Sequence, residues 1–324
     1  MAADSDGDCD ICLPFGRLNA LVKSFKGRKS ISISQEKDGK GHITLKSGQS
    51  RFKLPTLPAA DMPEMKEATE DTHFSVRSDD LRSWISKSVQ FATTDELRPY
   101  LHGISLQSED KTLTISGCNG HSLAKIVRPA PLGAEAIPDT IIHRPTCLAI
   151  LKILPNEVDV DISLGKATIS LTFDDLIYTA RLVDGVFPDI NRIIPADNGN
   201  IYEVQCEAFK QAVGRVSHIL SGADKLISSR VALSFKKTRL SISAENSGAE
   251  GEDIVACKRK SGDDVSIVFN LNYLLIIAEA AGTDTLIFHL PTADEAGSLN
   301  NSAAAKVMAT NNDDDLFVVM PMRA

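Results

Sequence analysis

The chain has 324 residues, of which 43% are hydrophobic and 24% are charged. This composition is typical of a globular protein with two or three domains of roughly 100–150 residues each. No segment approaches the ~20 consecutive apolar residues of a membrane-spanning helix, and residues 1–10 lack the basic start and apolar core of a secretory signal, so we expect a cytoplasmic protein. The formal net charge of −8 excludes a molecule that is basic throughout. Contacts with nucleic acid would therefore need Lys and Arg confined to one face.

The first elements predicted along the chain are a short apolar strand and an amphipathic helix in residues 10–22. Residues 50–65 then combine a strand, a Leu-containing turn and a Pro placed between apolar and acidic residues. Both patterns return, the first in residues 73–85 and 201–213 and the second in residues 178–190. The spacing from residues 73–85 to 201–213, and from residues 50–65 to 178–190, is about 125 residues, which is the size of a domain and predicts a repeated domain and not a solenoid.

In the two later copies, the periodicity is that of one half-buried strand followed by one helix. Phe74 and Val76 alternate with polar residues as in a strand, and so do Tyr202 and Val204. The helices that follow have one apolar face, formed by Leu81, Trp84 and Ile85 in one copy and by Phe209, Ala212 and Val213 in the other.

A shorter repeat lies within each unit. Residues 140–154 are again a strand and a helix, and strands are predicted after them at 158–164, 167–172 and 176–182. In the last unit, a strand at 265–269 and a helix at 272–281 precede strands at 285–289, 304–310 and 316–320. The module is therefore strand–helix–strand–strand–strand. It predicts an α+β protein in which antiparallel sheets bury their helices on one face.

Basic residues gather on four of the five predicted helices. The positions predicted to face DNA are Arg17, Lys23, Lys26, Arg82, Lys87, Arg144, Lys152, Lys210 and Arg215. If the helices of all modules converge on one surface, these side chains would contact phosphates without reading bases. The alternative is that they are ordinary solvated faces of surface helices.

The residues that usually carry catalysis show no recognisable spacing. Cys9 and Cys12 form one CxxC pair without the second pair that structural zinc needs, and no HExxH, GxSxG or phosphate-loop motif is present. Residues 39–41 fit a hairpin turn. The six cysteines are scattered and do not suggest disulfides. We therefore expect no enzymatic activity, no metal and no cofactor, and an enzyme is the least favoured class.

Four segments resemble the bacterial DNA polymerase III beta subunit, the sliding clamp. They are residues 94–104, residues 115–124, the Leu-Val-Asp-Gly-Val-Phe-Pro-Asp-Ile run that begins at Leu182, and the terminal Met-Pro-Met-Arg that begins at Met320. The resemblance extends from about Cys12 to Ala324. It implies a DNA-clamp fold with repeated βαβββ modules, antiparallel sheets outside and helices lining a central hole. Clamp domains would occupy residues 71–197 and 198–324, and residues 1–70 would correspond to the second half of a first domain.

The resemblance also implies a function. A homodimeric ring would encircle double-stranded DNA without sequence preference and act as a processivity factor in DNA replication. A hydrophobic cleft would bind short linear peptides of DNA polymerase, the clamp loader and repair proteins. The matching cleft positions are Leu101, Cys118, Gly120, His121, Ser122, Leu123, Pro188, Arg192, Ile193, Asn270, Tyr273, Val318, Met320, Pro321, Met322 and Arg323. For Leu123, Ile193 and Val318, ordinary core packing is the competing interpretation.

The sequence departs from the family pattern at several places. Cys118, Asn119 and Ser122 stand where the family usually has Thr, Asp and Arg, so peptide preference is expected to differ. The family's first module has no counterpart before Cys12. A misassigned gene start or truncation, a genuine short form, and a mobile-element variant are three explanations. The positions matching the dimer contact are Arg17, Leu21, Arg51, Phe52 and Leu54 on one side and Ile254 and Val255 on the other.

Two functions follow from these expectations. The first is a clamp that encircles DNA. The second is an adaptor that keeps the peptide cleft and competes for clamp partners but does not close into a ring. Because half a domain lacks a covering sheet, we expect residues 1–65 to be poorly supported and ring closure to be weakened.

Overall fold

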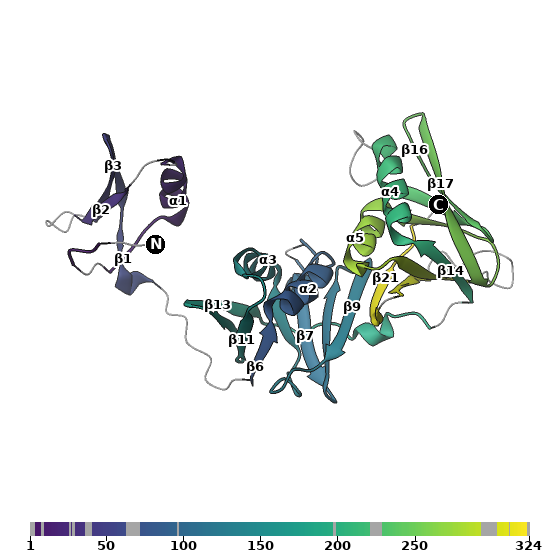
Figure 1. Ribbon diagram of the computed structural model, residues 1–324, viewed down its shortest axis with the longest axis horizontal. Coiled ribbons are helices and arrows are strands. Elements are labelled where there is room, and N and C mark those ends of the chain that lie inside the picture. Colours follow the sequence, from purple (N-terminus) through teal and green to yellow (C-terminus); the bar gives the residue numbers. More distant parts are fainter. Residues whose placement is uncertain are drawn as a thin grey trace. The chain divides into compact units, whose positions relative to one another are not determined.

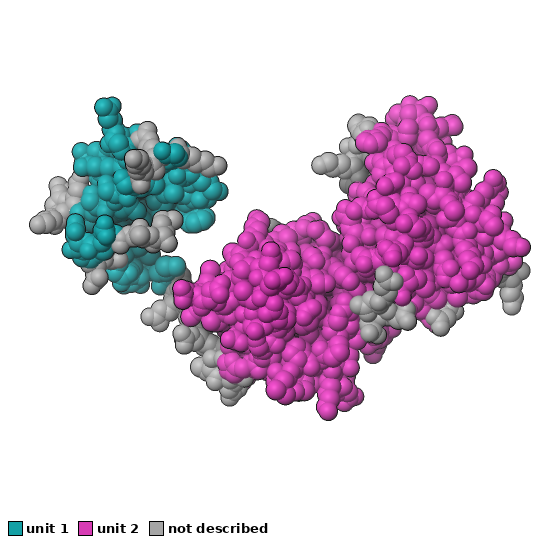
Figure 2. Space-filling view, in the orientation of Figure 1, with its two compact units in different colours: residues 1–67 teal, residues 68–324 magenta. Residues whose placement is uncertain are grey.

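The computed structural model describes residues 4–7, 10–25, 27, 30–35, 41–62, 72–95, 97–196, 199–220, 229–292, 303–310 and 312–322, and the side chains of these residues except 312–314. The chain divides into two compact units, Met1–Glu67 and Ala68–Ala324 (Figure 2). Two predicted site residues, Lys26 and Arg323, lie outside the described residues. So do residues 39 and 40 of the predicted hairpin turn.

Unit 1 is a small sheet with one helix. Its elements are β1 (Ile11–Cys12), α1 (Phe15–Ser24), β2 (Ser32–Gln35), β3 (His42–Ser47), β4 (Ser50–Pro55), β5 (Leu57–Pro58) and the 3-10 turn η1 (Ala59–Asp61). Strands β2, β3 and β4 form an antiparallel sheet in that order, and β1 pairs with β5. Phe25, Ile43, Leu45 and Leu54 form a core of their own. Leu18 and Leu21 of α1 pack against it, so one face of the helix covers the sheet.

Unit 2 contains four copies of the predicted module. The first two are β6 (Thr72–Arg77), α2 (Ser78–Val89), β7 (Gly103–Glu109), β8 (Thr112–Cys118), β9 (Ser122–Pro129), and β10 (Thr140–His143), α3 (Arg144–Ile153), β11 (Asp159–Leu164), β12 (Thr168–Phe173), β13 (Leu176–Val183). The last two are β14 (Asn200–Gln205), α4 (Cys206–Ser217), β15 (Arg230–Phe235), β16 (Arg239–Asn246), β17 (Ala249–Ser261), and β18 (Val265–Asn270), α5 (Leu271–Ala281), β19 (Thr285–Leu290), β20 (Ala305–Ala309), β21 (Asn312–Val319). The 3-10 turns η2 (Pro99–Leu101) and η4 (His218–Leu220) follow α2 and α4 within their modules, and η3 (Ile190–Arg192) lies between the second and third modules. The predicted strand–helix–strand–strand–strand order is confirmed.

The strands of unit 2 join into one 16-stranded sheet, and the helices lie on one side of it (Figure 1). The two halves of the unit meet where β9 pairs antiparallel with β21, with Leu123 opposite Val318. Helices α2 and α3 contact each other, as do α4 and α5, and α2 also contacts α5 across the junction. One continuous sheet therefore carries both halves, with the helices gathered along it.

Burial follows the predicted periodicities. Leu81, Trp84 and Ile85 of α2 are buried in the main core, and so are Phe209, Ala212 and Val213 of α4. Helix α5 ends at Gly282, whose φ of +56° is the left-handed conformation that glycine adopts without strain. Among the described helices, none is long and apolar enough to cross a membrane.

Candidate functional site: an apolar cleft at the module junction

A second apolar cluster, separate from the main core, lies at the junction of β9 and β21. Its buried members are Leu101, Cys118, Leu123, Ile141, Phe187, Ile190, Ala304 and Val318. Val183, Ile194, Leu316 and Met320 pack against it while remaining half-buried. We call this set the junction cleft, because the family resemblance predicts a peptide cleft at several of these positions. Because these residues come from both halves of unit 2, the cleft exists only where the two halves pair.

Strand alternation places the cleft residues. Successive side chains of a strand point to opposite faces of the sheet. Phe317 and Val319 of β21 enter the main core, whereas Val318 between them enters the cleft. Leu123 of β9 likewise lies in the cleft while its neighbour Ala124 is in the main core. The cleft is thus the sheet face opposite the helices.

Residues 320–322, which follow β21, form one wall of the cleft. The backbone N–H of Met320 donates a hydrogen bond to the carbonyl oxygen of His121 at 2.8 Å. The N–H of Met322 donates to the carbonyl oxygen of Val268, also at 2.8 Å. Two backbone hydrogen bonds therefore hold this segment, and Met320, Pro321 and Met322 are all half-buried. Met is a flexible apolar side chain that adapts to different partners.

The turn between β8 and β9 forms the rim. The side-chain oxygen of Asn119 accepts hydrogen bonds from the N–H groups of His121 at 2.9 Å and Ser122 at 2.8 Å. Gly120 has a φ of +90°, a conformation that favours glycine. The His121 ring stacks on Tyr273 of α5, with 6.4 Å between centroids and 17° between planes. This contact joins the rim to the far half of the unit.

Arg98 is a rim residue absent from the predicted set. Its Nη1 donates to the carbonyl oxygen of Asn119 at 3.4 Å, and its Nε is paired with Asp95 at 3.0 Å. Burial raises the pKa of the Tyr273 phenol, and the nearby Arg98 cation opposes that rise. Burial likewise raises the pKa of the Cys118 thiol. The segment of residues 94–104 that carries the family resemblance contains Arg98, so the signal was present in the sequence.

The structure brings part of the predicted peptide site together. Leu101, Cys118, Leu123, Val318 and Met320 belong to the junction cleft. Gly120, His121 and Tyr273 form the rim described above, and Ser122 is buried beside it. Pro188 and Pro321 are half-buried next to cleft residues in the sequence.

Three predicted positions are arranged differently. The side chain of Arg192 is 86% exposed and paired with Asp189 at 3.0 Å, and Ile193 is 40% exposed. Asn270 caps α5 by accepting from the N–H of Asn272 at 2.9 Å, and its amide donates to Ser229. Its side chain is therefore already engaged within the protein.

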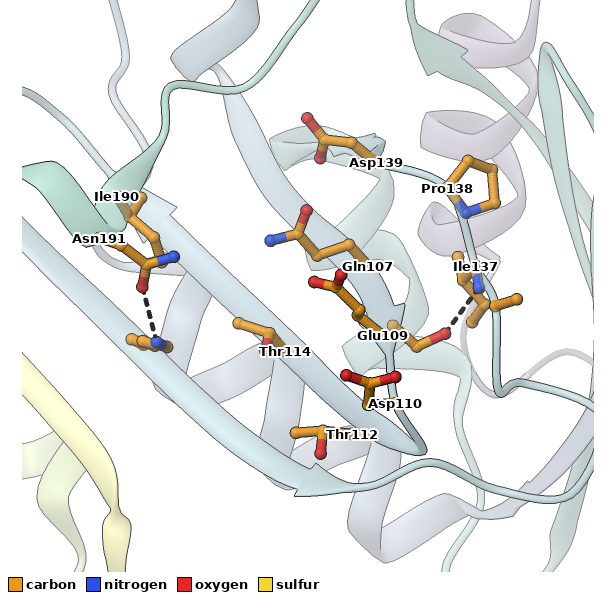
Figure 3. Close-up of a pocket in the computed structure, with 13 residues that line it drawn as sticks. Gln107, Glu109, Asp110, Thr112, Thr114, Ile137, Pro138, Asp139, Ile190 and Asn191 are labelled. Atoms are coloured by element: carbon orange, nitrogen blue, oxygen red, sulfur yellow. Dashed lines mark hydrogen bonds between the residues drawn. The ribbon is translucent and has the colours of Figure 1, made fainter.

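A polar groove of about 620 Å³ adjoins the cleft and shares Ile190 with it (Figure 3). Glu109, Asp110, Thr112 and Thr114 line it from β7, β8 and the turn between them. Asp139, at the opposite side, accepts a hydrogen bond from the N–H of Phe187 at 3.1 Å. This bond helps to hold Phe187 in the cleft.

Two of the predicted DNA-facing cations are engaged inside unit 2. The guanidinium of Arg82 donates to the carbonyl oxygens of Leu151 at 3.2 Å and Leu154 at 2.7 Å, at the end of α3. Helix ends leave carbonyl groups unpaired, so Arg82 acts as a cap. Lys87 forms an ion pair with the buried Asp315. These contacts leave less of either cation for phosphate, and sequence alone did not reveal them.

The other predicted cations differ in their surroundings. Arg215 is paired with Asp253 at 2.5 Å and Lys210 with Glu279 at 3.6 Å. Arg144 is half-buried, and its Nε has no hydrogen-bond partner among the described residues. Arg17 and Lys23 of α1 and Lys152 of α3 are exposed.

The predicted dimer residues divide into exposed and buried positions. Arg17, Arg51 and Phe52 are exposed in unit 1, and Ile254 is 54% exposed on β17. Leu21 is half-buried, whereas Leu54 and Val255 belong to the cores of their own units. Ile219, which the sequence did not single out, packs against Gly251 on β17.

Comparisons with known proteins fit this arrangement. Residues 75–189 match the family model of the DNA polymerase III beta subunit, central domain, and residues 191–323 match that of its C-terminal domain. The beta sliding clamp of Pseudomonas aeruginosa is 30% identical over 315 residues, which are 97% of this chain and 82% of that protein.

Solved structures agree. The crystal structure of the DNA polymerase III subunit beta from Pseudomonas aeruginosa has a TM-score of 0.84 at 29% identity and covers 99% of this chain and 85% of that chain. A crystal structure of the sliding clamp from the same organism bound to griselimycin has a TM-score of 0.81 at 28% identity, over 97% of this chain and 81% of that chain. The fold is therefore that of a sliding clamp. The chain belongs to the family of DNA polymerase III beta subunits.

Proposed function

We propose that this chain is a processivity clamp that encircles duplex DNA and tethers DNA polymerase and other partners through the junction cleft. The observation that carries the proposal is the junction itself. Central and C-terminal clamp domains meet there in one sheet, and the last residues of the chain complete an apolar cleft between them. In this proposal, residues 71–197 and 198–324 are successive clamp domains and residues 1–70 supply one further module.

The helix side of the sheet is the proposed DNA side. Exposed cations there include Lys152 of α3, and α1 of unit 1 carries Arg17 and Lys23. Contacts between such side chains and phosphates are independent of base sequence and weaken with salt, as a clamp that slides along DNA requires. The net charge of −8 does not oppose this role, because the acidic residues would lie elsewhere on the surface.

The junction cleft is the proposed partner site. Pockets for peptides combine apolar walls with a few polar groups that fix orientation. Met320 is half-buried and supplies apolar surface, Leu123 and Val318 are buried in the cluster against which it packs, and His121 and Arg98 lie at the rim. A short extended segment with bulky apolar side chains is the ligand that these features suit.

A second copy of the chain is proposed to close the ring. In unit 1, β4 pairs only with β3 among the described strands, and in unit 2 residues 249–256 of β17 pair only with β16. Both strands therefore have an open edge. The exposed cations Arg51 and Lys53 on β4 would meet the exposed carboxylates Glu250 and Glu252 on β17 of the partner copy. The β9–β21 pair is an internal example of such strand pairing.

This role needs no chemical step by the chain. Among the described residues, no three His, Cys, Asp or Glu side chains gather as a metal site requires. We propose that the chain is an accessory subunit and not an enzyme, and that it works in the cytoplasm, where a bacterial replicative polymerase works.

Retention on circular DNA tests the ring. The chain is loaded onto nicked circular DNA with its clamp loader, and the retained fraction is measured by gel filtration before and after one restriction cut. We expect retention on the circle and loss after linearisation, because a ring slides off free ends. Equal retention on both forms would overturn encirclement.

A further inference from the structure

Asp315 of β21 is a fully buried carboxylate held by two cations. Its relative exposure is 0%. Lys87 of α2 pairs with Oδ2, and Arg128 of β9 binds Oδ1 at 2.6 Å and Oδ2 at 3.1 Å. Both cationic side chains are 19% exposed. We call these three residues the junction triad.

The junction triad crosses the joint between the two halves of unit 2. Lys87 and Arg128 belong to the first module of the unit, and Asp315 belongs to the last strand of the chain. Phe317, two residues after Asp315, stacks on Phe91 with 5.6 Å between ring centroids and 24° between planes. The same strand is thus fixed to the first half by an ionic and an aromatic contact on its helix side.

Alternation links the junction triad to the cleft on the other face. Asp315, Phe317 and Val319 are buried toward the helix side, whereas Leu316, Val318 and Met320 face the junction cleft. A shift of one residue in the pairing of β21 with β9 would exchange the two sets. Val318 and Met320 would then leave the cleft, and the carboxylate of Asp315 would enter it.

Such a shift is strongly disfavoured, because it would move an ionised carboxylate from two cations to an apolar surface. A buried charge without a partner is destabilising by several times the net value of an ordinary hydrogen bond. Apolar residues along β21 would discriminate less between registers, since Leu316 and Val318 resemble Phe317 and Val319 in hydrophobicity. The ionic contact therefore specifies one register.

We propose that Lys87, Arg128 and Asp315 are positioning residues of the partner cleft: they fix the register of β21 on β9 and thereby place Val318 and Met320 against the bound peptide. This inference rests on the proposed peptide-binding function of the cleft. It assigns Lys87 to cleft positioning and not to DNA. Since the triad is buried, its effect is only weakly sensitive to salt.

The test compares full-length variants using griselimycin, the compound bound in the crystal structure of the related Pseudomonas aeruginosa clamp, as the probe. Griselimycin affinity is measured by surface plasmon resonance, and deuterium uptake of residues 315–322 is followed by mass spectrometry. For Asp315→Asn we expect the Kd for griselimycin to rise about tenfold or more, with faster exchange at residues 316–322. Lys87→Met should do the same more weakly, because Arg128 still holds the carboxylate. Lys87→Arg keeps the positive charge and should bind griselimycin with wild-type affinity.

Two controls keep the result interpretable. Asp253→Asn removes the carboxylate that pairs with Arg215 away from the cleft, and it should leave griselimycin affinity unchanged. Met320→Ala removes a cleft side chain directly and must weaken binding if the cleft is the peptide site. If Met320→Ala has no effect, the proposed peptide site fails. If Met320→Ala weakens binding but Asp315→Asn and Lys87→Met leave both affinity and exchange unchanged, only the positioning role is overturned. If Asp315→Asn does not fold, the comparison of Lys87→Met with Lys87→Arg tests the positioning role of the junction triad instead.

Discussion

The backbone N–H of Met320 donates a 2.8 Å hydrogen bond to the carbonyl oxygen of His121. This bond joins the end of the chain to the β8–β9 turn of the other half of unit 2. Here the last strand is held by β9, and the residues after it form a wall of the junction cleft.

Met320→Ala is therefore expected to weaken partner binding without unfolding the protein. The side chain of Met320 packs against the cleft cluster but is only half-buried, so its loss removes contact area without opening a core cavity. We expect the Kd for griselimycin to rise roughly tenfold, equivalent to about 1.4 kcal/mol. Isothermal titration calorimetry measures the affinity. Deletion of residues 320–324 should have a larger effect, and unchanged affinity after that deletion would refute the cleft assignment.

The periodicity of the sequence predicted the modules but not the cleft. Module order followed from periodicity, because strands and helices bury one face each and residues such as Trp84 and Phe209 mark that face. Cleft residues such as Leu123 and Val318 were identified only by family resemblance. Their alternation shows that one face is buried, but not what lies against it.

Partners distant in sequence could not be predicted. Lys87 and Asp315 are 228 residues apart, and nothing in either segment indicates that they meet. Arg82 has the charge and the position on its helix that are expected of a cation at the protein surface. Its guanidinium nevertheless caps the end of α3. A sequence gives the charge of a side chain, whereas its role depends on which element the fold brings to it.

Arg82→Met is expected to lower the free energy of unfolding. The guanidinium satisfies carbonyl groups at the end of α3, and the shorter apolar side chain leaves them to solvent or unpaired. We expect a loss of about 1–3 kcal/mol, typical of hydrogen bonds to a charged group. Urea unfolding followed by circular dichroism measures it. Arg77→Met is the matched control, because Arg77 and Asp159 form an exposed pair, and it should change stability by less than about 1 kcal/mol. Equal losses in both variants would contradict the capping role.

Lys152 and Lys87 should differ in their effect on DNA binding. Lys152 is exposed in the last turn of α3, whereas Lys87 is paired with Asp315. Each phosphate contact contributes about 0.9 to the slope of log affinity against log salt concentration. Lys152→Met should reduce that slope by about this amount if Lys152 contacts phosphate, and Lys87→Met should leave the slope unchanged. Fluorescence anisotropy on a short duplex at several KCl concentrations gives both slopes. The reverse pattern would place Lys87, and not Lys152, on the DNA.

His143 should make stability depend on pH. Burial lowers the pKa of His143 below its usual 6.5, and the neighbouring His102, 4.8 Å away between ring centroids, lowers it further. The unfolded chain then binds the proton more readily than the folded chain. The stabilising contribution is present above the unfolded pKa and is lost as pH falls through it toward the folded value. We expect the wild type to lose more stability than His143→Asn between about pH 7.5 and pH 5.5. If the urea midpoints of the two proteins fall by the same amount across this pH range, His143 does not contribute to the pH dependence of stability.

Charge exchange tests the proposed ring interface. Arg51 on β4 and Glu252 on β17 are both exposed at open strand edges, in units 1 and 2 respectively. In a head-to-tail dimer each would meet its opposite on the partner copy, and like charges at such a contact repel. Arg51→Glu and Glu252→Arg should each raise the dimer dissociation constant about tenfold or more. The double variant should recover much of the loss, because the pair is restored with its charges exchanged. Light scattering over a dilution series measures the dimer fraction. Lys111→Glu, at the exposed β7–β8 turn in the other half of unit 2 and several strands from β17 in the sheet, makes the same charge change and should have no effect. If the double variant loses as much dimerisation free energy as the two single variants together, Arg51 and Glu252 do not face each other.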